Sequence, residues 1–281
     1  MPDPTVAGGP TTGVRRGWTQ PGAARLVTSL MFALHALVFA SWTAHIPLVK
    51  QRLELDAGGL GLALLGAALG SVASMLLAGA AIARWGSRVV VGSTCVAFGL
   101  TALGVPLAGS GPTLFGALFC WGAAYGALDV AMNAQAITIE RSYGRPILSS
   151  FHAWWSLGAL AGSGLGIAAV HAGVRLSAQF AALGTATAAV AFALVAFMIP
   201  GDGSAESVRI VVPFGDRRLL SLGMIVLTGL LCEGAAADWT AVYLTDEVRV
   251  TPAVAGSGYA AFALAMFAGR IAGDRLVAAF G

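Results

Sequence analysis

Hydrophobic and polar positions divide the chain into eight long apolar runs that are separated by short charged connections. Each run has the length of about 20 residues or more that an α-helix needs to cross roughly 30 Å of hydrocarbon. The runs cover residues 26–47, 58–83, 89–108, 112–139, 147–170, 176–199, 219–244 and 254–273. The pattern therefore predicts an all-α, polytopic membrane protein with about eight transmembrane helices.

The polar segments indicate how these helices are grouped. Residues 1–25 are rich in Pro, Gly and Thr, and we expect them to form a disordered tail. The longest polar interval between runs, residues 201–218, is the expected linker between two bundles. Residues 26–200 would then form a bundle of six helices, and residues 219–281 would hold the first two helices of a second bundle.

Composition points to lipid, not water, as the main surrounding of the chain. Hydrophobic residues make up 57% of the 281 positions and charged residues 10%, against roughly 45–50% and about 25% in soluble domains. The Lys and Arg residues are scattered between apolar runs, so we expect no binding of nucleic acid. Cys95, Cys120 and Cys232 lie within apolar runs without the spacing of a metal site, and we expect neither a metal nor another cofactor.

The positive charges alternate between the two ends of successive runs. With the N-terminus placed in the cytoplasm, twelve of the 16 Lys and Arg residues, Arg270 among them, fall on the cytoplasmic side. The other four are Lys50, Arg52, Arg175 and Arg249. Because Lys and Arg gather in cytoplasmic connections, this bias predicts a multi-pass protein of the cytoplasmic (inner) membrane. The N-terminal tail and the central linker would lie inside the cell.

The sequence also repeats itself between the first and seventh runs. Residues 41–44 (SWTA) match residues 238–241 (DWTA) at an offset of 197, and glycines that follow each segment correspond at the same offset. Transporters with two similar bundles carry such repeats in parallel. The seventh run therefore restarts the pattern of the first.

Four stretches carry a resemblance to a known family. They are LDVAMNAQA (128–136), SFHAWWSLGALAG (150–162), EGAAADWTAVYL (233–244) and AGRIAGDRL (268–276). With the six-helix bundle, the polar linker and the parallel repeat, they resemble the major facilitator superfamily, and within it inner-membrane permeases of the YbjJ type in the fucose-permease-like branch. The resemblance implies a secondary active transporter that moves a small polar solute by alternating access.

The same resemblance implies further properties of the complete protein. Proton symport or facilitated diffusion is the implied mode of transport, and a monomer in the lipid bilayer is the implied assembly. Members of the superfamily have about twelve helices in two halves. By this comparison we expect the chain to be a C-terminally truncated fragment. The antiporter motif of the fifth helix contains a Gly-Pro pair that this sequence lacks, which favours a symporter or a facilitator.

The connection between the second and third runs resembles the superfamily's loop, G-x-x-x-D-R-x-G-R-R. Gly79, Arg84, Gly86 and Arg88 occupy matching positions, while Ala83 stands where the pattern has Asp. We expect the two arginines to place positive charge at the cytoplasmic surface, where an acidic group or a helix C-terminus can close an inward gate. The missing Asp weakens this interpretation.

Ionisable groups inside apolar runs are the main candidates for chemistry, because each is costly in lipid and should face a cavity and a partner. Asp129 and Asn133 lie one helical turn apart, so both project from one face of the fourth helix. They would bind a proton or a polar group of the solute. The alternative is a polar contact between helices.

Glu233 and Asp238 form a second candidate pair, in the seventh run. Five residues on a helix place them about 140° apart, so we expect at most one of them to face the cavity. Glu233 lies deeper in the run and is the preferred proton-coupling group, whereas Asp238 lies nearer the outer end. An interhelical hydrogen bond is the alternative role for either carboxyl group.

Aromatic and histidine side chains could line a cavity for sugars or similar solutes. His152 and Trp155 begin the fifth run, and His35 and Trp42 lie in the first. Tryptophans also gather at membrane interfaces, which is the alternative for Trp42 and Trp155. In the same fifth run, glycines 158, 162 and 166 form two overlapping GxxxG steps, which predict a face that packs closely against another helix.

Other classes of function have weaker support. The sequence contains no HExxH, no GxSxG and no Gly-rich phosphate loop, so an intramembrane enzyme is not expected. A membrane receptor or partner protein without transport activity, or an inactive truncated product, is the alternative to a transporter.

Overall fold

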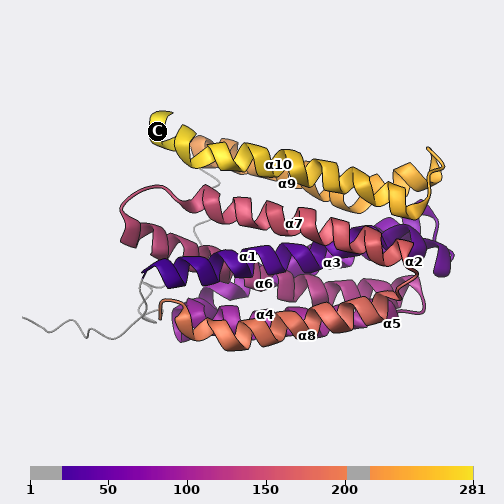
Figure 1. The fold of residues 1–281 in the computed structure, drawn as a ribbon, viewed down its shortest axis with the longest axis horizontal. Coiled ribbons are helices and arrows are strands. Elements are labelled where there is room, and N and C mark those ends of the chain that lie inside the picture. Colours follow the sequence, from indigo (N-terminus) through magenta and orange to yellow (C-terminus); the bar gives the residue numbers. More distant parts are fainter. Residues whose placement is uncertain (1–20, 201–215, 281) are drawn as a thin grey trace, which may run out of the picture.

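The structure, a computed structural model, describes residues 21–200 and 216–280. All regular secondary structure in these two segments is helical, and eight of the helices are long and apolar enough to cross a membrane. The helices are α1 (Pro21–Thr43), α2 (Ile46–Arg52), α3 (Ala57–Trp85), α4 (Ser87–Ala102), α5 (Gly104–Leu107), α6 (Gly111–Tyr143), α7 (Leu148–His171), α8 (Leu176–Leu194), η1 (Val195–Phe197), α9 (Arg217–Asp246) and α10 (Pro252–Phe280). The predicted all-helical class, the number of spans and their order are confirmed. The long helices run side by side along one axis (Figure 1).

Two predicted segments fall mostly outside the described residues. These are the N-terminal tail, of which positions 1–20 are not described, and the central linker, of which positions 201–215 are not described. The part of the tail that is described differs from the prediction, because residues 21–25 belong to α1. Pro21 opens this helix, and proline is well suited to a first helical turn, where its missing N–H is not needed. At the other segment, the Asp216 carboxylate accepts from Arg218 N (2.8 Å) and caps α9.

The first predicted span, residues 26–47, is divided in the structure. The long helix α1 ends at Thr43, and the short helix α2 follows with Pro47 in its first turn. The hydroxyls of Ser41 and Thr43 donate to the carbonyls of Val38 (2.8 Å) and Ala40 (2.9 Å). Such bonds compete with the helical ladder, and proline favours the start of a helix over its continuation. The chain therefore breaks here although the apolar run continues.

Local capping fixes the tight connection between α6 and α7. Gly144 adopts a left-handed conformation (φ 62°) and its N–H donates to the Glu140 carbonyl, which ends α6. The Glu140 carboxylate then accepts from the N–H groups of Ile147 and Leu148, both at 2.7 Å. One acidic side chain thus satisfies donors at the start of α7 that have no partner within the helix.

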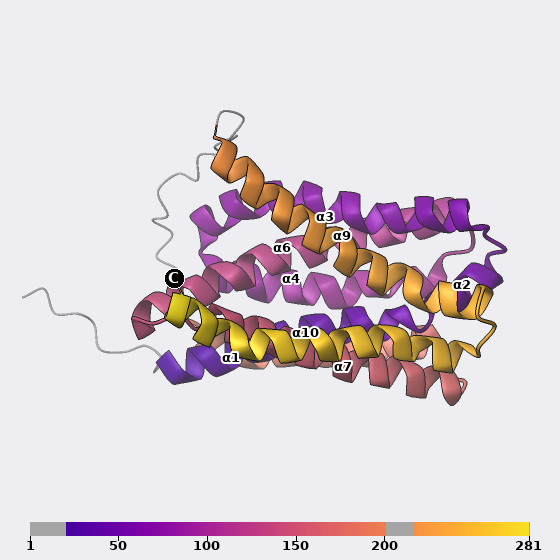
Figure 2. The ribbon, with the colours of Figure 1, turned by 90° about the horizontal axis from the view of Figure 1, so that it is seen from above.

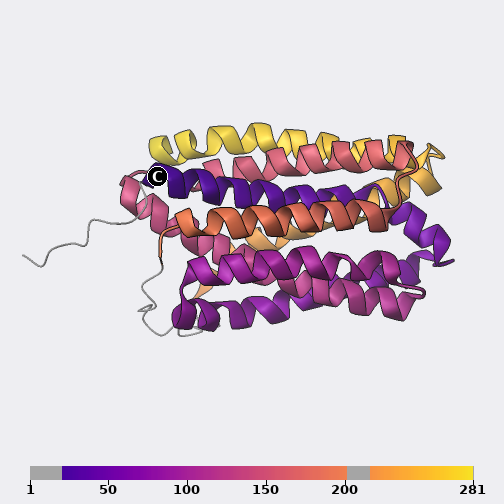
Figure 3. The same ribbon diagram turned by 60° about the horizontal axis from the view of Figure 1, so that its bottom comes forward.

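The first bundle is built from pairs of long helices. α3 packs on α6, α1 packs on α7, and α4 packs on both α6 and α8. Its core is rich in large buried side chains, among them Phe32, Trp42, Phe98, Phe151 and Phe180. The later helix α10 packs along α7 and α9, so that α10, α7, α1 and α8 form successive layers (Figure 3). Helix α7 therefore joins the two bundles.

The glycines of α7 bring it into backbone contact with α1. A Cβ atom added at any of the three would collide with a carbonyl group of α1, which side-chain movement cannot relieve. The contacting pairs are Gly158–Ala33, Gly162–Leu37 and Gly166–Ser41. The close-packing face predicted from the GxxxG steps is confirmed.

Helix α9 is held mainly near its C-terminal end. Lys50 of α2 forms an ion pair with Asp246, the last residue of α9, at the end of the molecule where α2 and the α9–α10 connection meet (Figure 1). Seen from above, α9 runs obliquely while α10 follows α1 and α7 (Figure 2). Large apolar side chains along the first half of α9 are exposed: Leu219, Leu220, Leu222, Met224, Ile225, Val226, Leu227, Leu230 and Leu231. Such a surface requires an apolar surrounding.

Candidate functional site between the two bundles

Arg270 of α10 is the centre of the polar contacts between the bundles. Its Nη1 donates to the Ser156 hydroxyl of α7 at 2.7 Å, and its Nη2 lies 3.5 Å from Oε2 of Glu233 on α9. The guanidinium also lies 5.3 Å from the ring centroid of Trp155, in a cation–π arrangement. The side chains of Arg270 and Glu233 are each 21% exposed. One cation therefore connects three helices and both bundles.

Arg270 was expected among the cytoplasmic connections, and this role was not predicted for it. The structure places Arg270 near the end of the span Pro252–Gly273, within a helix and not in a connection, and its contacts lie within the helix bundle. A long arginine side chain can reach back along its helix to a partner, so its charge need not lie at the helix end. The sequence did contain one indication of this role, because a carboxyl group inside an apolar run, such as Glu233, is expected to have a cationic partner.

Asp129 and Asn133 face the same region from α6. The Asn133 amide donates to the Asp129 backbone carbonyl at 2.9 Å and lies 3.4 Å from its carboxylate, which confirms that the two share a face. Asp129 is in turn within electrostatic range of Glu233, across the boundary between the bundles. The structure thus brings together two of the predicted carboxylates, which are separated by more than a hundred positions in the sequence.

Two tyrosines complete this group of interacting side chains. Tyr259 of α10 is 1% exposed, and its hydroxyl has no hydrogen-bond partner among the described residues. It interacts electrostatically with Glu233, Arg270 and Asp238. Tyr125 of α6 interacts with Asp129, Glu233, Arg270 and Tyr259. We call this set the interface cluster: Tyr125, Asp129, Glu233, Asp238, Tyr259 and Arg270. Neither tyrosine was a candidate from the sequence.

The remaining cavity candidates lie in more packed surroundings. His35 is 1% exposed, its ring centroid is 4.0 Å from that of Tyr125, and neither ring nitrogen has a hydrogen-bond partner among the described residues. Trp42 is 2% exposed and packs against Phe180 in the core of the first bundle. Trp155 lies under Arg270 as described above. The proposed lining role of His35 and Trp42 stays a prediction.

A cavity of about 310 Å³ opens next to Arg270, between the beginning of α7 and α10. His152 lines it, and the ring of His152 also packs edge-on against Phe32, with centroids 5.4 Å apart. The complete lining is Leu148, Ser149, His152, Gly269, Arg270 and Gly273. Arg270 therefore belongs both to the interface cluster and to the lining of this cavity.

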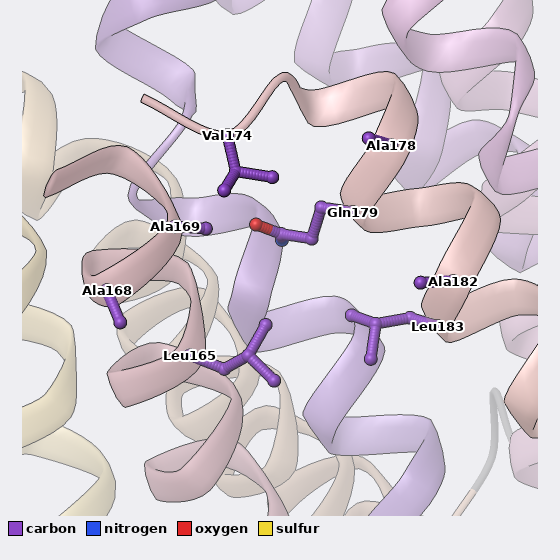
Figure 4. Close-up of a pocket in the computed structure, with 8 residues that line it drawn as sticks. All are labelled: Leu165, Ala168, Ala169, Val174, Ala178, Gln179, Ala182 and Leu183. Carbon is purple, nitrogen blue, oxygen red and sulfur yellow. The ribbon is translucent and has the colours of Figure 1, made fainter. Parts of the chain in front are cut away.

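A second, larger groove has different chemistry. It has a volume of about 420 Å³ and an almost wholly apolar lining from α7, α8 and their connection (Figure 4). Its one polar side chain, Gln179, is engaged: Nε2 of His45 donates to its amide oxygen (2.9 Å), and its amide nitrogen donates to the Ser41 carbonyl (3.1 Å). Burial lowers the pKa of His45, and the hydrogen bond to Gln179 partly opposes this shift. This groove offers no charged group to a solute.

The predicted gating loop is reduced to a single residue between two helices. Gly86 has φ 78° and its N–H donates to the Ile82 carbonyl, so that α3 ends at Trp85 and α4 begins at Ser87. Arg84 is exposed and lies 5.8 Å from the Trp85 ring centroid. Gly79 and Arg88 are half-buried. The gating role of these four residues stays a prediction.

Metal binding has no support in the described segments, which contain no group of three or more His, Cys, Asp or Glu side chains able to hold an ion. The cluster can instead bind protons, accept hydrogen bonds and pair with charged groups.

Comparison with known proteins assigns the family. The chain is 35% identical over 277 residues to an uncharacterized transporter of the major facilitator (MFS) type from Yersinia pestis, a match that covers 96% of this chain and 71% of the relative. The chain belongs to the major facilitator superfamily of membrane transporters. It is therefore a multi-pass membrane protein, and transport, not enzymatic catalysis, is the activity of its relatives.

Two other relatives resemble the chain over similar stretches. The uncharacterized transporter y4wD of Sinorhizobium fredii is 31% identical, over 89% of this chain and 67% of the relative. The membrane protein MosC of Rhizobium meliloti is 32% identical, over 94% of this chain and 65% of the relative. No protein-family model matches the chain.

The crystal structure of a mutant of the nucleoside transporter NupG has the same fold, with a TM-score of 0.57 and 15% identity. The match covers 82% of this chain and 56% of the NupG chain. At this identity the likeness shows the superfamily fold alone. The chain thus spans between 56% and 71% of the length of these proteins.

Proposed function

We propose that this chain forms part of a secondary active transporter that moves a small polar solute across the bacterial inner membrane by alternating access, through proton symport or facilitated diffusion. Its relatives are named transporters, which supports the class. The four sequence stretches favour the YbjJ-type, fucose-permease-like branch. The distribution of Lys and Arg favours a cytoplasmic N-terminus, and the complete transporter is expected to act as a monomer.

The single observation that carries this proposal is the position of the interface cluster. Its members come from α6 of the first bundle and from α9 and α10 of the second, and Arg270 bonds to α7 as well. Transporters of this architecture bind solute and coupling ion between their two halves, near the middle of the membrane. Ionisable groups are costly there and are retained where they serve a pathway.

The contacts of Arg270 suggest how one proton could act on both bundles. While Glu233 is ionised, its carboxylate holds the guanidinium between α9 and α7. Protonation of Glu233 removes this charge pairing and leaves Arg270 with Ser156 and Trp155 on α7 alone. The strength of the contact between the bundles would then depend on whether Glu233 carries a proton, which is the requirement for coupling.

A flux assay tests the proposal. The natural gene product that contains this chain is reconstituted in lipid vesicles, and radiolabelled adenosine and L-fucose serve as first probes. We expect Glu233→Gln to abolish uptake driven by a proton gradient while exchange of labelled for unlabelled solute partly persists. Glu247→Gln, an exposed carboxyl at the end of the same helix, is the matched control and should leave both activities unchanged. Gradient-driven uptake that survives Glu233→Gln with the same pH dependence would remove Glu233 from the mechanism.

A further inference from the structure

The interface cluster contains more negative than positive formal charge. Its three carboxyl groups belong to Asp129, Glu233 and Asp238. Among the described residues, Arg270 is the cation paired with one of them, Glu233. With all four groups ionised, the cluster would carry a formal charge of −2. Such an excess inside a membrane requires protons or a cationic ligand to balance it.

The cluster also contains more hydrogen-bond acceptors than donors. An ionised carboxylate offers about four acceptor positions and no donor. Arg270 already directs N–H groups to Ser156 and Glu233, and the Asn133 amide donates to a carbonyl within its own helix. A ligand that fits this inventory brings several N–H donors and a positive charge. An ammonium group, with three donors and no acceptor, has both properties.

Tyr259 points independently to a ligand in the same place. Its side chain is among the largest that the structure buries fully, yet its hydroxyl finds no hydrogen-bond partner among the described residues. A buried polar group without a partner is destabilising, so one that is retained usually serves a bound group or an ordered water. Its electrostatic neighbours, Glu233, Asp238 and Arg270, place it at the cluster.

The helices that carry Asp129 and Glu233 do not pack closely on each other. In the described part of the chain, α6 packs on α3 and α4, whereas α9 packs on α10, α2 and α1. Asp129 and Glu233 therefore interact across a boundary at which their own helices do not pack closely. A cavity of about 310 Å³, within the range of small-molecule sites, lies beside Arg270, which is the member of the interface cluster that lines it.

We propose that the transported solute carries a protonated primary amine, whose ammonium group binds among the Asp129 and Glu233 carboxylates and the Tyr259 hydroxyl. This inference rests on the proposed transport function and specifies its substrate class. An anionic solute would meet the excess negative charge and an arginine that is already engaged. A neutral solute would leave the excess charge to be balanced by protons alone.

Two sets of matched compounds test the charge of the ligand. One set is D-glucosamine, D-glucose and D-glucuronate, and the other is 5′-amino-5′-deoxyadenosine, adenosine and adenosine 5′-carboxylate. Each set varies the charge on one framework. Thermal unfolding of the purified full chain in lipid nanodiscs is measured with each compound at pH 7. We expect at least one amine to raise Tm in a saturable way and its neutral and acidic partners to have no effect. An equal or larger shift with a neutral or acidic member, or no shift with either amine, would overturn the proposal.

Three variants locate the bound amine. Asp129→Asn should weaken amine binding by at least about thirtyfold, since it removes one partner of a charge pair. Tyr259→Phe removes one hydroxyl and should weaken amine binding by about tenfold. Because that hydroxyl is unpartnered, the same variant should leave the ligand-free Tm unchanged or raised, which separates a binding role from a structural one. Glu247→Gln is the control and should bind as the original chain does. Unchanged amine binding in both Asp129→Asn and Tyr259→Phe would refute the site.

Transport is measured separately in vesicles, as exchange of the same labelled compounds. If the neutral members are exchanged and the amines are not, the proposed transport function stands and the amine proposal fails. If amines raise Tm but no member of either set is exchanged, the site stands and the transport function fails.

Discussion

Replacement of Gly162 by alanine should separate α7 from α1. A Cβ atom at this position would lie 2.8 Å from the Leu37 Cα atom and 2.9 Å from its carbonyl carbon. Ordinary contacts between carbon atoms are about 3.5–4.0 Å, so the two backbones must move apart by more than about half an ångström. The obstacle is backbone, and no side-chain rotation can relieve it.

The cost follows from the packing of the whole helix pair. Inserting one methyl group into a well-packed interior usually costs about 1–3 kcal/mol. The same substitution in an unhindered helix stabilises it by up to about 1 kcal/mol, because alanine is the better helix former. Gly164 provides the unhindered control, since nothing lies within 4 Å of a Cβ atom added there, on the same helix and two residues away.

Thermal unfolding in detergent measures the difference. Gly162→Ala should lower Tm and Gly164→Ala should leave it unchanged or raise it, with a gap of about 1–4 kcal/mol between the variants. At about 2 °C or more per kcal/mol, the two values of Tm should differ by at least about 2 °C. Equal values for both variants would contradict the backbone contact between α7 and α1.

Three further perturbations test other contacts. Lys50→Asp should lower Tm because it removes the ion pair with Asp246, and the double variant that also carries Asp246→Lys should restore Tm because it reverses the pair. High salt should reduce both changes in Tm. If Tm is the same in the single and the double variant, the ion pair does not stabilise the protein. Arg270→Gln should lower Tm because it leaves the half-buried Glu233 carboxylate without its cationic partner. Adding Glu233→Gln should recover part of the lost stability in a double-mutant cycle. Burial lowers the pKa of His45 from its usual 6.5, so the unfolded chain binds more protons below that pH and stability should fall as pH decreases through this range. His45→Gln should reduce the slope of Tm between pH 7 and pH 5, and an unchanged slope would contradict the burial of this ring as its cause.

The spans were predictable from sequence because lipid leaves the backbone few choices. A segment that cannot bond to water must bond to itself, so a long apolar run becomes a helix wherever tertiary packing later puts it. The break after Thr43 escaped this reasoning, because hydroxyl bonds and Pro47 end the helix inside an apolar run. Side-chain hydrogen bonding of this kind does not change the hydropathy profile.

The candidate site was predictable only in part. Asp129 and Glu233 were found because a carboxyl group in an apolar run is conspicuous. Arg270 was missed because an arginine near the end of a run looks like a connection residue, and its partner Glu233 lies on another helix. Tyr259 was missed because a tyrosine in such a run resembles any core or interfacial aromatic residue. Partnership across helices depends on packing, which a single sequence does not display.

The three glycines of α7 have a consequence for motion between the bundles. Where two backbones touch directly, sliding or tilting has no slack, so α1 and α7 must move as one rigid unit. On its other side, α7 meets α10 through side chains, including Ile167 against Gly256 and the Arg270 contact with Ser156, and these side chains can change rotamer. If the second bundle rotates as a rigid body, we therefore expect the rotation to occur at the interface between α7 and α10, while α1 and α7 stay fixed relative to each other.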